Sequence, residues 1–120
     1  MKATYVLYSP NHLVRTKTLS STARILLDVF ALHMREEDNL IYFIEGGMVF
    51  YIGYCEFHLN RKYSEKTIRN AVSEIVKCGV MKRVKSNIYT IDKNFCIKVD
   101  VTKRLAEKQK GSMNNSAEVD

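Results

Sequence analysis

The sequence predicts a single α+β domain, and three patterns along the chain support this prediction. Residues 3–8 are β-branched and aromatic, which is typical of a strand. Apolar residues recur with helical spacing at about 21–34 and again at 68–76, and an alternating segment follows at 80–91. A chain of 120 residues with 46% apolar content is long enough to bury one modest core.

The N-terminal third is predicted to contain a strand, a turn and the first core helix. The strand covers residues 3–8, and Ser9-Pro10-Asn11 follows as a turn. The helix is expected from about Ser21 to Met34, with Ser20 or Ser21 as its N-cap. Its apolar face consists of Ala23, Leu26, Leu27, Phe30 and Met34.

The middle of the chain holds two aromatic-rich segments on either side of a glycine pair. Leu40–Ile44 and Met48–Ile52 are predicted to form an extra β-hairpin, joined by a turn at Glu45-Gly46-Gly47. A short helix is expected next, from about residue 54 to 60, with Cys55 and Leu59 pointing inward.

Residues 64–79 predict a second, strongly amphipathic helix. Ser64 is a suitable N-cap, and Gly79 stands where helices commonly end in a left-handed conformation. The apolar stripe consists of Ile68, Ala71, Val72, Ile75 and Val76. The opposite face carries hydrogen-bond donors, namely Lys66, Arg69, Asn70, Ser73 and Lys77.

A tight two-stranded ribbon is predicted at 80–91, immediately after this helix. Asn87 tolerates a positive φ and suits the turn of the ribbon. Lys82, Arg83 and Lys85 surround the turn, which is the placement expected of cations that contact phosphates. The segment Phe95–Val101 is predicted to dock as a further strand.

Charge is distributed unevenly along the chain. Residues 1–60 contain 5 Lys/Arg and 6 Asp/Glu, whereas residues 61–110 contain 14 and 5. The cations therefore gather in the half that holds the amphipathic helix and the ribbon, which indicates a face for nucleic acid. No strongly apolar helical face accompanies them, so we expect no membrane binding.

The predicted order of elements is that of a winged helix-turn-helix with an N-terminal strand and an extra β-hairpin. We expect this domain to occupy residues 1–101. Residues 102–120 are predicted to form a basic extension, helical over 103–110, and a flexible tail.

The chain resembles the winged-helix replication proteins of small plasmids and phages, often called RepL-like. The resemblance covers roughly Tyr5 to Val99 and is carried by three segments: LSSTARILLDVFALHM, YSEKTIRNAVSEIVKCGVMKRV and NIYTIDKNFCIK. It implies a DNA-binding protein of a mobile element, acting in replication initiation or transcriptional regulation. The second segment is also similar to many winged-helix transcription regulators.

Sequence-specific binding to double-stranded DNA is therefore the expected function. Base edges, or the phosphates beside them, would be contacted from the exposed helix face by Lys66, Thr67, Arg69, Asn70 and Ser73. The backbone would be held by Arg61, Lys62, Lys82, Arg83 and Lys85. Ser64 caps the helix, and Tyr63 either donates to a phosphate or packs inward.

The sequence contains no recognisable catalytic set, so we expect no enzyme activity, metal or cofactor. His12, His33 and His58 are scattered, and Cys55, Cys78 and Cys96 lack the spacing of metal ligands. The odd cysteine count and the absence of a signal peptide predict free, mostly buried thiols and a cytoplasmic protein.

The sequence leaves alternatives open for the partners of the protein. One alternative is that the winged-helix fold serves as a protein–protein module, for instance a phage accessory factor on an acidic host surface. A homodimer is also expected, since alternation along the predicted strands cannot bury all of Tyr5, Leu7, Tyr42, Phe43, Phe50 and Tyr51. The alternative is a monomer in which the sheet folds back over the first helix and buries them. Host replication or transcription proteins are further expected partners.

Overall fold

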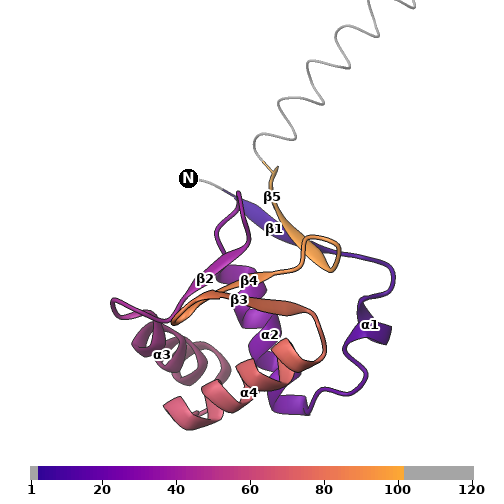
Figure 1. The fold of residues 1–120 in the computed structure, drawn as a ribbon. Helices are drawn as coiled ribbons and strands as arrows, with labels where there is room; N and C mark the ends of the chain where they lie inside the picture. Colours follow the sequence, from indigo (N-terminus) through magenta and orange to yellow (C-terminus); the bar gives the residue numbers. More distant parts are fainter. Residues whose placement is uncertain (1–2, 102–120) are drawn as a thin grey trace, which may run out of the picture.

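The computed structural model describes residues 3–101, which form an α+β fold with four helices and two small antiparallel sheets (Figure 1). The predicted extension and tail at 102–120 lie outside these residues. In chain order the elements are β1 (Thr4–Tyr8), α1 (His12–Arg15), α2 (Ser21–His33), β2 (Leu40–Tyr42), α3 (Gly47–Leu59), α4 (Glu65–Lys77), β3 (Met81–Lys85), β4 (Ile88–Ile91) and β5 (Cys96–Asp100).

Two of the three strand pairings join segments that are distant in sequence, whereas β3 and β4 form a hairpin. β1 pairs with β5, from Thr4 opposite Asp100 to Tyr8 opposite Cys96, so the two ends of the described chain meet. The other sheet has the order β2–β4–β3, with β4 in the centre. The predicted strands at 3–8 and at 95–101 and the predicted ribbon at 80–91 are thus confirmed.

Helices α2 and α4 supply most of the helical part of the core. Ser20, the residue before α2, accepts a hydrogen bond from the backbone N–H of Ala23 and is the N-cap of that helix. Leu26 and Phe30 of α2 and Ile68 and Ile75 of α4 are completely buried. These are positions that the 3.6-residue pattern assigned to the core, and the pattern located both helices because each has one polar face.

The predicted hairpin at 40–52 is wrong. Only Leu40–Tyr42 is a strand, and the segment predicted as its partner begins the thirteen-residue helix α3, which also absorbs the short helix expected at 54–60. Because α3 is apolar on every side, its sequence has no helical period to distinguish it from a strand. Cys55 is buried as predicted, whereas Leu59 is 38% exposed and does not point into the core.

The loop before α3 contains two glycines with different roles. Glu45 and Gly46 both have positive φ, and Gly46, with a φ of 87°, is the N-cap of α3. A Cβ at Gly47 would collide with the backbone carbonyl of Tyr42, so this position requires glycine. Phe50 and Tyr51, expected on a strand, therefore lie on adjacent faces of α3, one 47% exposed and the other buried.

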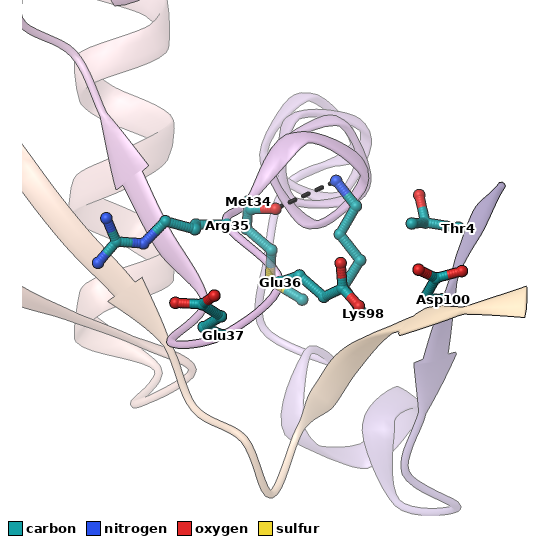
Figure 2. Close-up of a pocket in the computed structure, with 7 residues that line it drawn as sticks. All are labelled: Thr4, Met34, Arg35, Glu36, Glu37, Lys98 and Asp100. Carbon is teal, nitrogen blue, oxygen red and sulfur yellow. Dashed lines mark hydrogen bonds between the residues drawn. The ribbon is translucent and has the colours of Figure 1, made fainter. Parts of the chain in front are cut away.

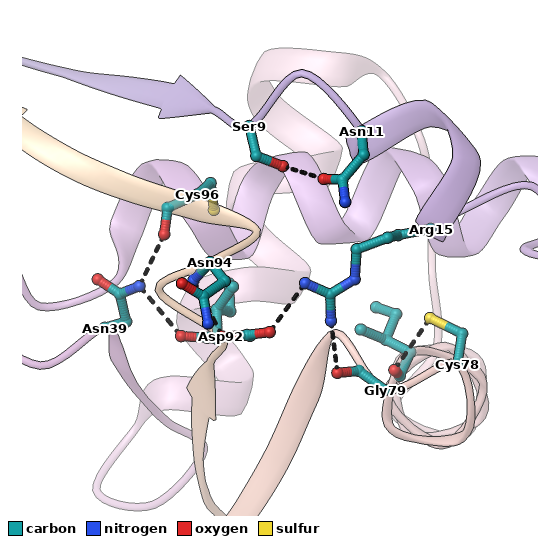
Figure 3. Close-up of polar contacts among 11 residues, drawn as sticks. Ser9, Asn11, Arg15, Asn39, Cys78, Gly79, Asp92, Asn94 and Cys96 are labelled. Atoms are coloured by element: carbon teal, nitrogen blue, oxygen red, sulfur yellow. Dashed lines mark hydrogen bonds and ion pairs between the residues drawn. The ribbon is translucent and has the colours of Figure 1, made fainter.

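Arg15 in the short helix α1, which the sequence did not predict, connects three parts of the fold (Figure 3). Its guanidinium donates to Asp92 Oδ2 at 2.8 Å and to the carbonyl oxygen of Gly79 at 2.9 Å. It also lies over the ring of Phe95, 5.7 Å from the centroid. Arg15 thereby ties the turn between β4 and β5 to the end of α4.

Asn39 joins the two sheets from a fully buried position. It is 1% exposed and has a φ of 57°. Its side-chain amide donates to the carbonyl oxygens of Ile91 at 3.0 Å and of Cys96 at 2.9 Å (Figure 3). The backbone carbonyl oxygen of Asn39 accepts from the backbone N–H of Ile91. One side chain therefore satisfies a carbonyl oxygen at the end of β4 and another at the start of β5.

Replacing Asn39 with Asp is expected to lower the free energy of unfolding by about 2–4 kcal/mol, because an acceptor would then face two buried carbonyl oxygens. Asp tolerates positive φ nearly as well as Asn, so the change tests the donor and not the backbone. Urea denaturation measures the effect. A loss of less than ~0.5 kcal/mol would show that water replaces the amide without cost.

Asp92 is expected to make stability depend on pH. Hydrogen bonds from the backbone N–H of Asn94 and from Arg15 lower the pKa of its carboxyl group. A lowered pKa in the folded state contributes stability that is present above the ordinary value of about 4 and is lost as pH falls through the folded value. The advantage of the parent over Asp92→Asn should therefore be constant above about pH 5 and shrink in acid. Chemical denaturation at several pH values checks this, and an advantage that grows in acid would contradict it.

Candidate nucleic-acid interface

Helix α4 presents the polar face that the sequence predicts. Ser64 is its N-cap, since its Oγ accepts from the backbone N–H of Thr67 at 3.2 Å, and the two hydroxyl groups are 3.0 Å apart. The buried face consists of Ile68, Ala71, Val72 and Ile75, whereas Val76, predicted to be inside, is 36% exposed. The exposed side chains include Lys66, Arg69, Asn70, Ser73 and Lys77.

A polar contact on the opposite side fixes the orientation of α4. The carboxylate of Glu74 accepts from the backbone N–H of Ser20 at 3.0 Å and from its hydroxyl at 2.9 Å. Since Ser20 caps α2, this contact holds α4 against the N-terminus of α2. The donor-rich face of α4 consequently points away from the core.

The segment between α3 and α4 adds two exposed cations. Asn60 has a φ of 53° and ends α3, and the N–H of Arg61 returns to the carbonyl oxygen of Cys55 at 3.0 Å. Arg61 and Lys62 are both exposed.

Tyr63 does not fulfil the phosphate-donor role considered for it. Its ring packs against the core, and its hydroxyl is buried without a hydrogen-bond partner among the described residues. In this conformation the hydroxyl cannot reach a ligand at the surface, so the packing interpretation of Tyr63 is the one that the structure supports.

The β3–β4 hairpin carries the second group of predicted cations. Lys82, Arg83 and Lys85 are all exposed, and the pairing of β3 with β4 shifts between Arg83 and Lys85. Asn87 occupies the turn with a φ of 61°, and its backbone carbonyl accepts from the N–H of Phe43 at 2.8 Å. The tip of the hairpin is thereby attached to the loop that precedes α3.

Arg69 brings the helix and the hairpin together. Its Nη1 donates to Asn87 Oδ1 at 3.1 Å, and its Nη2 donates to Glu65 Oε1 at 3.4 Å. The two groups of predicted site residues therefore belong to one surface. Glu65 and the side chain of Asn87 were not predicted to belong to the site. The spacing of Glu65 and Arg69, four residues apart on a helix, was a readable signal for the first contact.

The charge of this surface is strongly positive. Residues 61–85 contain eight Lys/Arg and two Asp/Glu. Glu74 is bonded to Ser20 on the far side of α4, which leaves Glu65 as the acidic side chain of this segment beside the cations. We call the exposed face of α4 together with residues 61–62 and the β3–β4 hairpin the basic face.

A pocket of mixed charge lies away from the basic face. It has a volume of about 930 Å³ and lies between the end of α2 and the β1–β5 sheet (Figure 2). Lys98 crosses it to donate to the carbonyl oxygen of Met34 at 3.1 Å. The residues that line the pocket are Thr4, Met34, Arg35, Glu36, Glu37, Lys98 and Asp100.

The cysteines and histidines of residues 3–101 do not assemble a metal site. No group of three His, Cys, Asp or Glu side chains in this range is placed to hold a metal ion. All three cysteines are free, and Cys55 and Cys96 are buried, in agreement with the prediction of free, mostly buried thiols. Burial raises the pKa of the Cys96 thiol to about 12. Such a thiol is protonated at neutral pH and is a poor nucleophile.

No protein-family model, curated protein or solved structure matches this chain. Within residues 3–101, every helix is too short or too polar to span a lipid bilayer.

Proposed function

We propose that this protein is a winged helix-turn-helix that binds double-stranded DNA in a sequence-specific manner. The observation that carries the proposal is the basic face: a helix with an exposed donor-rich side lies beside a cationic hairpin, and Arg69 bonds to both. An exposed helix beside a cationic hairpin is suited to reading bases in the major groove while phosphates are held on either side.

The topology supports the same proposal. The elements α2, β2, α3, α4, β3 and β4 follow one another in the order of a winged helix, with β2, β4 and β3 forming its small sheet. In this scheme α3 and α4 are the two helices of the helix-turn-helix, and the β3–β4 hairpin is the wing. The predicted extra hairpin has no place in it, because residues 47–59 form α3.

The roles of individual residues follow from their positions on the basic face. Lys66, Asn70 and Ser73 project from α4 toward base edges, and asparagine can pair with adenine through two hydrogen bonds. Thr67 is partly covered and already bonded to Ser64, which suits contact with a phosphate near the helix N-terminus. The remaining cations hold the DNA backbone: Arg61, Lys62, Lys82, Arg83 and Lys85.

The biological process is proposed from the resemblance to RepL-like proteins. It favours a cytoplasmic protein of a plasmid or phage that acts in replication initiation or transcriptional regulation and recruits host proteins for the later steps. A protein–protein module is the alternative function, and one observation favours it. Val49 and Phe57 on α3 are 73% and 84% exposed, an unusual degree of exposure for large apolar side chains.

Salt dependence distinguishes the two functions. The parent protein should bind duplex DNA with an affinity that falls steeply as salt rises, because bound cations release counterions from the phosphates. Replacing Lys82, Arg83 and Lys85 together with Ala should weaken binding to all duplexes alike and reduce the slope of log K against log salt by about 2–3.

A matched variant controls for the change in net charge. Lys17, Arg24 and Lys93 are exposed cations outside the basic face, and their joint replacement with Ala should leave most of the slope intact. DNA affinity that is negligible at every salt concentration would refute DNA binding and favour the protein–protein alternative. A loss confined to one duplex sequence would mean that the hairpin reads bases.

A homodimer stays a prediction, with its structural basis revised. Of the six large side chains that were expected to crowd the strands, Phe43 and Tyr51 are buried and Tyr5 is half-buried, whereas Leu7, Tyr42 and Phe50 are 47%, 36% and 47% exposed. Sedimentation equilibrium at micromolar concentration is expected to show self-association above the 13.9 kDa monomer. A single species at the monomer mass would contradict the dimer and the two-fold symmetric DNA site that a dimer implies.

A further inference from the structure

Glu65 is out of place on the basic face. It lies in the first turn of α4, where its side chain is 59% exposed, and it stands among the cations that the proposed function assigns to DNA. A carboxylate at this position weakens the attraction of the N-terminal turn of α4 for a phosphate. A residue that weakens binding to DNA in general can increase the preference for one DNA sequence over others.

Arg69 is held from two sides by groups of the protein itself. Glu65 accepts from its Nη2 and the side chain of Asn87 accepts from its Nη1, so one contact comes from α4 and the other from the hairpin turn. Both contacts leave the side chain half exposed, at 50%. A guanidinium has five N–H donors, of which these contacts use two, so donors remain for a DNA base.

The paired carboxylate changes what Arg69 gains from DNA. A free arginine is attracted to every phosphate, but the charge of Arg69 is already compensated by Glu65. On a random duplex, the Glu65 carboxylate is repelled by the phosphates, and Arg69 adds little attraction to offset this repulsion. A guanine offers two acceptors, O6 and N7, to the remaining donors, and a cytosine offers an N4 donor to Glu65 itself.

We propose that Glu65 and Asn87 determine specificity by holding Arg69 back from phosphates, so that a site with a correctly placed G·C pair is preferred over random DNA. This inference rests on the proposed function and deepens it. The negative charge of Glu65 lowers the affinity for random DNA, and the side chain of Asn87 fixes Arg69 from the hairpin. The hairpin turn is itself held by the hydrogen bond from the N–H of Phe43 to the carbonyl oxygen of Asn87. Discrimination of this kind needs a repulsive element as well as an attractive one.

The test compares two variants with a charge-matched control. Glu65→Gln removes the charge and keeps the size of the side chain. Asn87→Gly removes the amide and suits the φ of 61° at this position. Glu37→Gln is the control, because Glu37 is exposed in the loop after α2 and makes the same change in net charge away from the basic face.

Dissociation constants are measured for a random-sequence duplex and for a duplex that the parent protein selects from a random library. Glu65→Gln should bind the random duplex roughly three- to tenfold more tightly and the selected duplex with a smaller gain, so the ratio of the two affinities falls. Asn87→Gly should reduce the ratio in the same direction. Glu37→Gln should change both affinities alike and preserve the ratio.

The outcomes separate this inference from the function on which it rests. If the parent protein shows no salt-dependent binding to any duplex, the proposed function fails. If the parent binds and selects DNA but either Glu65→Gln or Asn87→Gly keeps the parental ratio, the inference is overturned and DNA binding stands. Circular dichroism of each variant confirms that the fold is retained, and both positions are at the surface or in a turn where the changes are compatible with folding.

Discussion

The buried amide of Asn39 is the contact on which the arrangement of the two sheets depends. Neither sheet is large: one has two strands and the other three. Asn39 lies where the loop after α2 meets β4 and β5, and its two N–H donors satisfy carbonyl oxygens from both. Leaving a buried carbonyl oxygen without a donor would reduce stability by more than the hydrogen bond itself contributes. Position 39 therefore requires a side chain that donates hydrogen bonds. The positive φ of Asn39 adds a second restriction, which an asparagine meets more easily than most residues.

The position of the basic face depends on these contacts of Asn39. β4 is the central strand of the three-stranded sheet and one arm of the hairpin, so its position sets where the hairpin stands beside α4. Arg15 adds a second connection by joining Asp92, just after β4, to Gly79, just after α4. Glu74 and Ser20 attach the same helix to α2. The face proposed to contact DNA is thus supported from behind by three polar contacts between distant segments, and its own side chains remain available.

The parts of the fold that the sequence predicted are those with a local signal. Ser64, the apolar stripe from Ile68 to Ile75 and Gly79 located α4 almost to the residue, and Asn87 located the hairpin turn. Helix α3 was missed because a segment that is apolar on every side has the same appearance in a strand and in a helix. The contacts of Asn39 and Arg69 could not be predicted for a different reason. The two side-chain contacts of Asn39 join residues 52 and 57 positions apart, and the contact of Arg69 with Asn87 joins residues 18 positions apart, so no local sequence pattern encodes them.

The all-round apolar character of α3 also bears on how the chain behaves when it unfolds. Its first turns contain Met48–Ile52, five uncharged residues without proline and rich in β-formers. In the folded protein this segment belongs to α3, and Tyr51 packs edge-on against Phe30 with ring centroids 5.1 Å apart. Once those restraints are lost, the same residues can pair as strands between molecules and start aggregation. The helical conformation of α3 therefore keeps an aggregation-prone segment from pairing as a strand.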